Sequence, residues 1–500
     1  MGIENVSGDF LGNFFMNINN EFLTHGVITI SAICLIILIA NVLRRKIPLF
    51  RRTFMPTAVI AGLLGLVIKE AVLAVTGIMI FNISTLNWMV YHALPIAFIA
   101  LSLREKDDYS GDPGAAAIHK NRVAPSKSGC FIIGYYMVQA LVGIAVTAFL
   151  AVTFIPELNK AVGIMLALGY GQGPQQAFAT GNIWDAAEAG RGYMSYWRTL
   201  DPNPARNYGL TIAAIGFLWA SIPGIILVNI VARKKGISRT KDEFQKSGDV
   251  KSYSIEGPDE IPLSESIDKF SLQVCMVGGV YLFTIGFVIG LEMIFNASGV
   301  KFLVELIPTF WGFLFMLGAL FALCTKLILR RLVKTGVMNR KYPNSYMMNR
   351  ISGAAFDLSI TAALILVSVF TLGSLWIPII VMTTIGGLVT LFYVRFVTKH
   401  VYKNYSEEAF LGFYGMSVGT IANGMILLRE IDPTFKSPAG EDLVLGSSAA
   451  IILALPLLFL IPRAPAEGNL WWVTLVIAGY FLALMLYLFK EKIFGRKKTA

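Results

Sequence analysis

The chain has 500 residues, of which 55% are hydrophobic and only 15% charged, and its net charge is +11. Soluble domains carry about 25% charged residues, so this composition excludes an ordinary soluble protein. The hydrophobic residues form long uncharged runs, not the alternating strands of about ten residues that build membrane β-barrels. We therefore expect an all-α polytopic membrane protein.

The N-terminal segment, residues 1–25, combines helical spacing of large apolar residues with an absence of Lys and Arg. A secretory signal peptide needs a basic region before its apolar core, so we do not expect this segment to be cleaved. It predicts a helix that lies in the membrane interface or packs against the rest of the protein. The apolar residues are Leu11, Phe14, Phe15, Ile18 and Phe22.

Uncharged runs of about 20 residues, the length that crosses a bilayer as a helix, predict eleven spans. Five lie in each half of the chain, with a polar linker at 233–269 between the halves, and the last forms residues 463–500 together with a basic tail. Lys69 and Glu70 interrupt the second run, and we expect them to snorkel at the membrane rim. The predicted spans are 22–43, 55–75, 88–103, 129–155 and 207–232, then 270–291, 306–325, 351–371, 375–394 and 443–462, and finally 468–489.

Two further apolar stretches, 161–184 and 409–428, are interrupted at their centres. The first contains Gly-Tyr-Gly-Gln-Gly-Pro-Gln-Gln at 169–176, and the second contains Gly-Met-Ser-Val-Gly-Thr-Ile-Ala-Asn-Gly at 415–424. Irregular backbone at membrane depth is stable only where protein buries it or where it lines a wet cavity. Paired interruptions at matching positions of two halves mark the binding sites of secondary transporters. We predict that both stretches are re-entrant hairpins.

The distribution of basic residues tests this interpretation. If both stretches turn back, the loops on one side of the membrane carry 35 of the 42 Lys and Arg residues, whereas each side carries 21 if both stretches span. Cytoplasmic loops are enriched in Lys and Arg, so the bias favours hairpins. It predicts a plasma (inner) membrane protein with its N-terminus outside and its C-terminus in the cytoplasm. The same loops account for the net charge, and we expect no nucleic-acid partner.

The two halves have the same order of elements: four spans, a hairpin and a fifth span. Because each half crosses the membrane five times, an odd number, the second half must have the opposite orientation in the membrane. This arrangement is the inverted-repeat plan of many secondary transporters. We predict a first repeat at 26–232 and a second repeat at 270–462.

The hairpin centres offer a set of neutral binding groups. Broken helices point amide groups at anions and free carbonyls at cations, so this set suits a small polar anion together with Na⁺. The alternative is glycine-mediated helix packing with incidental polar residues. The candidates for Na⁺ are Ser417, Thr420 and Asn423, and the full set adds Gly171, Gln172, Gly173, Gln175, Gln176 and Gly419.

Two charged residues are further candidates. Arg429 directly follows the second hairpin and either holds a substrate carboxylate in a bidentate pair or lies at the cytoplasmic rim beside Glu430 or Asp432. Asp357 lies inside the eighth span and either coordinates an ion or forms a salt bridge with Arg350.

At the hairpins the chain resembles the bacterial glutamate:sodium symporter family. The stretch 415–423, continuing into Arg-Glu-Ile-Asp-Pro at 429–433, is similar to the second-hairpin signature of that family, and 169–173 is similar to the first. The resemblance implies Na⁺-coupled uptake of an acidic amino acid by an elevator movement of a hairpin-bearing domain against a homodimeric scaffold. The chain departs from the family at the first tip, where the usual Gly-Gly-His-Gly with a following Thr is replaced and two glutamines are new.

The leading hypothesis is import of glutamate or a related small anion with Na⁺ across the lipid bilayer. A 2-hydroxycarboxylate carrier would share the architecture but would place more than one arginine at the tips, and only Arg429 is near. A channel would be built from rings of equivalent residues. The chain contains no Ser/His/Asp set, metal-ligand cluster or phosphate-binding loop, so we expect neither an enzyme nor a cofactor other than the coupling ion.

Overall fold

The structure is a computed structural model that describes residues 21–48, 50, 55–104, 123–188, 203–235, 269–304, 306–338, 342–368, 375–432, 437–466 and 468–493. Within these ranges the chain forms helices and no strand. The expected interfacial segment up to residue 20, the linker from 236 to 268 and the basic tail from 494 lie outside the described residues.

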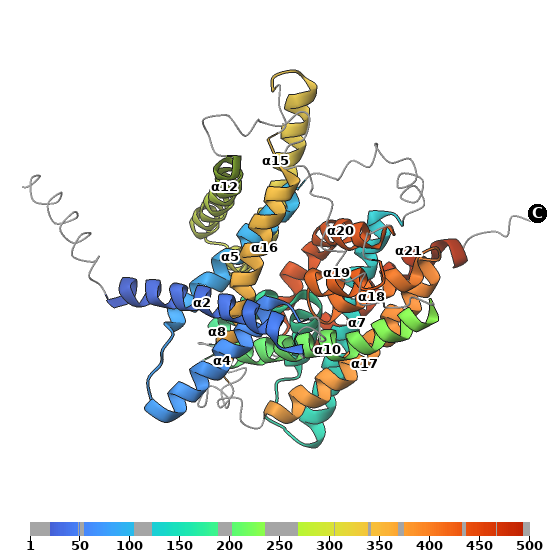
Figure 1. The fold of residues 1–500 in the computed structure, drawn as a ribbon, viewed down its shortest axis with the longest axis horizontal. Helices are drawn as coiled ribbons and strands as arrows, with labels where there is room; N and C mark the ends of the chain where they lie inside the picture. Colours follow the sequence, from blue (N-terminus) through green and yellow to red (C-terminus); the bar gives the residue numbers. More distant parts are fainter. Residues whose placement is uncertain are drawn as a thin grey trace, which may run out of the picture.

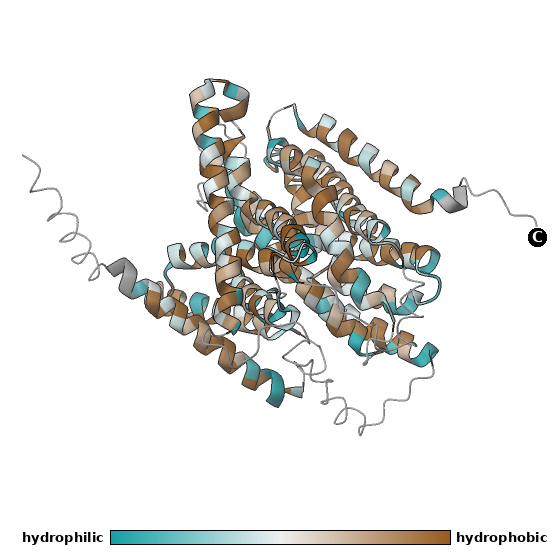
Figure 2. Ribbon diagram, turned by 90° about the horizontal axis from the view of Figure 1, so that it is seen from above, coloured by the Kyte–Doolittle hydropathy of each residue, from teal (hydrophilic) through white to brown (hydrophobic). Residues whose placement is uncertain are grey.

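Nine helices in the described ranges are long and apolar enough to cross a membrane. Many of their large apolar side chains face outward, such as Leu282 at 72% and Met293 at 67% exposure, and Figure 2 shows hydrophobic residues along most of the long helices. Lipid tolerates such surfaces, whereas water penalises them. The predicted all-α polytopic membrane protein is thereby confirmed. The nine helices are α2 (Glu21–Lys46), α4 (Thr57–Thr76), α5 (Ile83–Leu103), α7 (Pro125–Thr153), α10 (Pro204–Lys234), α12 (Lys269–Ser298), α17 (Trp376–Val401), α20 (Ala439–Leu460) and α21 (Leu470–Ile493).

The seventh and eighth predicted spans differ from the structure. The run predicted at 306–325 is broken at Phe313, whose ψ of 29° is not helical, and the helix beyond the break ends in a basic turn. The helix in the eighth position begins before residue 351 and carries two charged residues, Arg350 and Asp357. Neither is among the nine helices that qualify by length and composition. These helices are α14 (Ile307–Gly312), α15 (Leu314–Lys334) and α16 (Ser345–Ile365).

The helices form two groups, which lie side by side in Figure 1. The first, here called the scaffold group, contains α2, α4, α5, α12, α14, α15 and α16. The second, the hairpin group, contains α7, α10, α17, α20 and α21 together with the two interrupted segments. α8 (Pro174–Glu188), which is part of the first interrupted segment, packs against α5, α14 and α16 and forms much of the contact between the groups.

The expectation that Lys69 snorkels to the rim is wrong. Its side chain is 3% exposed, and its ammonium donates to the carbonyls of Ile365 at 2.9 Å and Val367 at 2.6 Å, at the C-terminus of α16. The Glu70 carboxylate lies 3.1 Å from the same ammonium. The last carbonyls of a helix have no partner within the helix and carry partial negative charge, so a buried ammonium is stable there.

The long helices of the hairpin group run in opposite directions in the two halves. α10 and α17 finish at one end, where Lys234 and Arg395 both bond to Glu407. α7 begins at this same end, since Tyr402, which follows α17, donates to Ser128 near the start of α7 at 2.9 Å. α20 begins there too, with Asp442 bonded to Tyr405. We call this the basic end and the opposite end the far end.

Candidate functional site

The first interrupted segment begins beside α7 at the far end. It starts with η2 (Lys160–Ile164) and continues into the π-helical η3 (Ala167–Gln172). A Cβ atom on Gly143 of α7 would lie 1.9 Å from the carbonyl oxygen of Gly163 in η2. The two backbones are therefore in direct contact, and only glycine fits at position 143. Further along, Gly171 faces Gln139, near the middle of α7. This arm therefore runs from the far end to the middle of the helix group.

The chain reverses at Gly173, whose φ of +91° lies in a region that favours glycine. α8 then returns along α10, with Ala177 against Gly209 and Gly181 against Arg206. Near the end of α8 the Asp185 carboxylate accepts hydrogen bonds from the first backbone amides of α10, Ala205 and Arg206, both at 3.0 Å. The segment thus leaves at the far end, where it began, and we call it the first hairpin.

The second interrupted segment, here the second hairpin, consists of α18 (Ser406–Ser417), a short turn and α19 (Ile421–Arg429). The two helices pack on glycines: a Cβ atom on Gly424 would lie 2.3 Å from the carbonyl oxygen of Gly412. On its way back α19 follows α10, with Leu427 against Gly224. This hairpin begins at the basic end and returns toward it, opposite in direction to the first.

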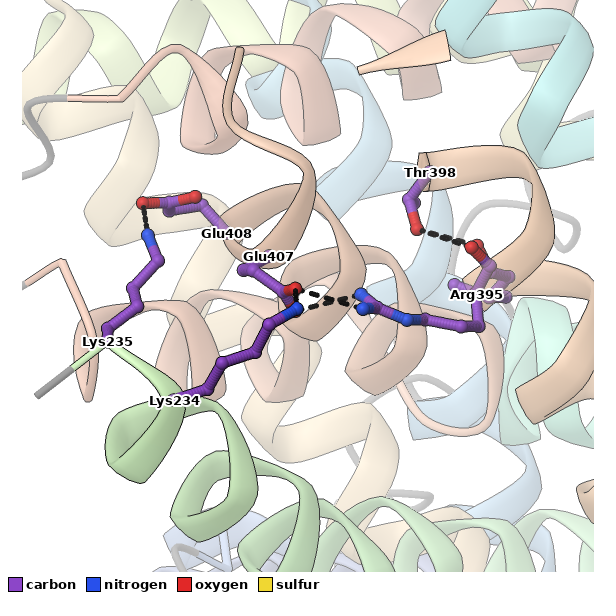
Figure 3. Close-up of polar contacts among 7 residues, drawn as sticks. Lys234, Lys235, Arg395, Thr398, Glu407 and Glu408 are labelled. Atoms are coloured by element: carbon purple, nitrogen blue, oxygen red, sulfur yellow. Dashed lines mark hydrogen bonds and ion pairs between the residues drawn. The ribbon is translucent and has the colours of Figure 1, made fainter. Parts of the chain in front are cut away.

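An ionic cluster fixes the base of the second hairpin (Figure 3). Glu407 accepts two hydrogen bonds from Arg395, at 2.8 and 2.9 Å, and one from Lys234 at 2.7 Å, while Glu408 pairs with Lys235. Burial raises the pKa of Glu407, but the bonds and charges of Arg395 and Lys234 together outweigh it, so the pKa lies below its usual value. The start of α18 is thereby tied to the ends of α10 and α17.

The tips of the two hairpins meet in the middle of the group. A Cβ atom on Gly173 would lie 3.6 Å from the Thr420 methyl carbon and 3.8 Å from the carbonyl oxygen of Gly419. Gln139 of α7 holds the second tip by donating to the carbonyl of Ser417 at 2.8 Å. Because α8 and α19 both begin at these tips, two helix N-termini with partial positive charge are brought close together.

The structure brings most of the predicted site residues together at the tips. Gln172 and Thr420 are half-buried and the other tip residues are buried. The predicted Na⁺ ligands already bond within the second hairpin: Ser417 Oγ donates to the Tyr414 carbonyl, and Thr420 Oγ1 donates to Asn423 Oδ1, both at 2.9 Å. The tip residues are Gly171, Gln172, Gly173, Gln175 and Gln176 with Ser417, Gly419, Thr420 and Asn423.

Three buried polar atoms on α8 have no hydrogen-bond partner among the described residues: Gln175 Nε2, Gln176 Oε1 and Thr180 Oγ1. The three side chains are 2%, 4% and 0% exposed. Gln176 and Thr180 are four positions apart and so share one side of the helix. Thr180 was not among the candidate site residues predicted from the sequence. Its position, one helical turn after Gln176 in an apolar run, could have indicated it.

Two predicted candidates lie away from the tips. Arg429 is the exposed last residue of α19, at the base of the second hairpin. Asp357 is exposed on α16 in the scaffold group and interacts electrostatically with Arg44 of α2. Its expected partner Arg350 lies over the ring of Tyr346, 5.0 Å from the ring centre. The geometry therefore assigns neither residue to the tips.

A small cavity, with room for little more than one water molecule, lies beside the first tip, between α8, α5 and the break that separates α14 from α15. Gln175 lies in its wall, two positions after the turning point Gly173.

Comparisons with protein-family models, curated proteins and solved structures find no match.

Proposed function

We propose that the protein is a Na⁺-coupled secondary transporter that imports glutamate or a related small anion across the plasma membrane, with the substrate carboxylate bound where the hairpin tips meet. One observation carries the proposal: two hairpins approach from opposite ends, and a Cβ atom on Gly173 of the first tip would lie within 4 Å of Gly419 and Thr420 of the second. Buried amide atoms that have no described protein partner lie beside this place. Helix N-termini and amide donors together form an anion site without a charged side chain.

Inverted repeats are part of this proposal, and matched contacts in the two halves support them. Lys69 is the thirteenth residue of α4 and binds carbonyls at the C-terminus of α16. Lys326 is the thirteenth residue of α15 and binds the carbonyls of Ser102 and Arg104, at the C-terminus of α5, at 2.8 and 2.9 Å. Each half therefore supplies a lysine that caps the equivalent helix of the other half.

A second pair of contacts follows the same relation. Asn82 caps the N-terminus of α5 by accepting from the Thr85 amide, and Asn344 caps α16 by accepting from the Met347 amide, both at 2.9 Å. The backbone amides of these asparagines donate to side chains of the first helix of their own half, Thr29 in α2 and Gln273 in α12. Two copies of one ancestral unit account for such pairs.

For Na⁺ the supporting groups lie on α8. A sodium ion needs oxygen ligands that are not already committed to other bonds, and buried oxygens without a partner are costly unless something binds them. Gln176 Oε1 and Thr180 Oγ1 meet this description, whereas the oxygens of Thr420 and Asn423 bond to each other. We therefore place the ion beside the first hairpin.

The division into two groups suits an elevator movement, in which the hairpin group slides against the scaffold group. α8 lies at the boundary and contacts helices of both groups, so a substrate bound at its N-terminus would move with the hairpins. The homodimer implied by the family resemblance would be formed through the scaffold group.

The test is uptake into proteoliposomes that contain the purified protein. An inward Na⁺ gradient should drive saturable accumulation of a labelled acidic or small neutral amino acid, and an equal K⁺ gradient should not. Substitution of Gly419 by Val, whose side chain would crowd Asn423 and Gly415 and so distort the second tip, should abolish uptake while the protein still inserts. Uptake that rises linearly with concentration and ignores Na⁺ would point to a channel and overturn the proposal.

A further inference from the structure

The ends of three helices of the scaffold group meet in one cluster of basic and polar residues. Lys326 of α15 donates to the carbonyl of Arg104, the residue that follows α5, at 2.9 Å. The Arg104 guanidinium donates to the side-chain oxygen of Asn349, near the start of α16, at 3.2 Å. Arg350 comes next in α16 and lies over the ring of Tyr346. We call this cluster, together with the end of α15, the scaffold rim.

The scaffold rim is strongly basic. Its described residues, with those at the start of the adjacent α12, include seven Lys and Arg and no Asp or Glu. The base of the second hairpin differs, because Glu407 and Glu408 form ion pairs with the cations there (Figure 3). The described part of the rim therefore carries an excess of positive charge. The seven residues are Arg104, Lys269, Lys326, Arg330, Arg331, Lys334 and Arg350.

One exposed face of α15 changes from apolar to basic along the helix. Leu327 and Ile328 are 59% and 58% exposed. Arg331 and Lys334, which are also exposed, follow at spacings of three or four residues and so share this face. Figure 1 shows the last turns of α15 at the top of the view, beyond the start of α12. Exposed apolar surface thus lies directly beside exposed cations.

This order matches the two parts of an anionic phospholipid. Its acyl chains pack on apolar side chains, and its phosphate binds Arg and Lys. A dissolved anion would use the cations alone, and a soluble acidic segment would leave Leu327 and Ile328 without hydrocarbon around them. An excess of cations is also what the positive-inside bias predicts on the cytoplasmic side, where the leaflet carries anionic lipids.

We propose that the scaffold rim binds an anionic phospholipid, with the phosphate at Arg331 and Lys334 and the acyl chains along Leu327 and Ile328. The interaction does not depend on the proposed transport function, because the rim belongs to the scaffold group and not to the hairpin tips. In an elevator transporter, the bound lipid would hold the scaffold group in place while the hairpin group moves.

The test is lipid binding to the purified full-length protein in a neutral detergent. Native mass spectrometry measures the dissociation constants of phosphatidylglycerol and of phosphatidylcholine with the same acyl chains. Each cation near an anionic headgroup contributes about fivefold in affinity, so the protein should prefer phosphatidylglycerol by roughly 25-fold. The double variant Arg331→Gln, Lys334→Gln should lose this preference, with little change in phosphatidylcholine binding.

The matched control is Lys160→Gln, Lys301→Gln, which removes two exposed cations outside the rim and should keep the preference. All four substituted side chains are exposed, so both double variants should unfold at the temperature of the unmodified protein. A rim variant that keeps the preference, a control that loses it, or equal binding of the two lipids by the unmodified protein would overturn the proposal. Displacement of phosphatidylglycerol by inorganic phosphate at a similar concentration would assign the rim to free anions and overturn it too.

Discussion

At the scale of single residues, Asn423 shows how the second tip is held. Its side chain is 3% exposed, and its Oδ1 accepts a hydrogen bond from Thr420 at 2.9 Å. If Gly419 carried a Cβ atom, that atom would lie 3.0 Å from the side-chain amide carbon of Asn423. One amide thus closes the turn, and its NH₂ group can still donate to a bound carboxylate.

Asn423→Ala should weaken substrate binding strongly. The loss of a hydrogen bond to a charged group costs about 1.5–3 kcal/mol, which corresponds to roughly 10- to 150-fold in the dissociation constant. Titration of the purified variant measures the change. Thr420→Val removes only the internal bond to Asn423 and should have a smaller effect. Equal and small effects of both substitutions would assign Asn423 to packing.

Thr180→Val should raise the Na⁺ concentration that gives half-maximal uptake. The substitution keeps the shape of the side chain and removes one oxygen, a change worth about 0.5–1.5 kcal/mol or roughly 2- to 12-fold. Thr211→Val is the matched control, because Thr211 is also buried but donates to the Asn207 carbonyl within its own helix at 2.8 Å. A similar shift in both variants would contradict an ion ligand at Thr180.

The tip residues were predictable from sequence because glycine, proline and amides rarely interrupt an apolar run without a structural reason. The sequence could not predict that one polar atom in each of three α8 side chains lacks a hydrogen-bond partner, since this depends on which neighbours pack against α8. The side chains are Gln175, Gln176 and Thr180. The positions of Arg429 and Asp357 also required the fold, because a charged residue near a hairpin in sequence can lie at its base or on another helix.

At the scale of helices, the lysine caps connect the two halves. Lys69 on α4 and Lys326 on α15 each satisfy two terminal carbonyls of a helix in the other half. The sequence suggested that Lys69 was a rim residue, because a lysine within an apolar run gives no indication of a partner almost 300 positions away. Likewise, the break at Phe313 directly follows Gly312, but a single glycine within an apolar run is tolerated in many helices and does not by itself predict a break.

Lys69→Met and Lys326→Met should each lower the thermal unfolding temperature. Each removes the donor for two helix-terminal carbonyls, which are buried at Lys69 and partly buried at Lys326. A buried acceptor left without a partner costs about 1–3 kcal/mol, so the larger effect is expected at Lys69. Lys301→Met, at an exposed position in the short helix α13 (Lys301–Val304), should leave stability unchanged. A large effect at only one of the two caps would argue against equivalent roles in inverted repeats.

At the scale of the whole molecule, the distribution of charge agrees with the direction of the hairpins. The polytopic helical architecture followed from the uncharged runs, although two of the eleven predicted spans differ from the structure. The sequence did not predict how the helices divide between the scaffold group and the hairpin group, because runs of similar composition occur in both. The basic end contains Lys234, Lys235 and Arg395, and the positive-inside bias predicts that it faces the cytoplasm.

Single cysteines test this orientation in a variant from which Cys34, Cys130, Cys275 and Cys324 have been removed. Asn404→Cys lies in the exposed turn between α17 and α18 at the basic end, and Glu157→Cys lies in the exposed turn after α7 at the far end. In intact cells a membrane-impermeant thiol reagent should label the cysteine at 157 and spare the one at 404. The reverse pattern would invert the topology.

The reciprocal lysine caps also have a consequence for biogenesis. Lys69 leaves the ribosome long before the carbonyls that it binds, which follow 296 positions later, and the end of α5 waits for Lys326 over 222 positions. A first half that has already been inserted therefore carries a buried lysine that has only Glu70 as its partner, and a helix end whose carbonyls wait for the second half. Quality-control proteases can recognise such a stalled intermediate. Two halves synthesised as separate polypeptides should survive in the cell together and be degraded when either is made alone.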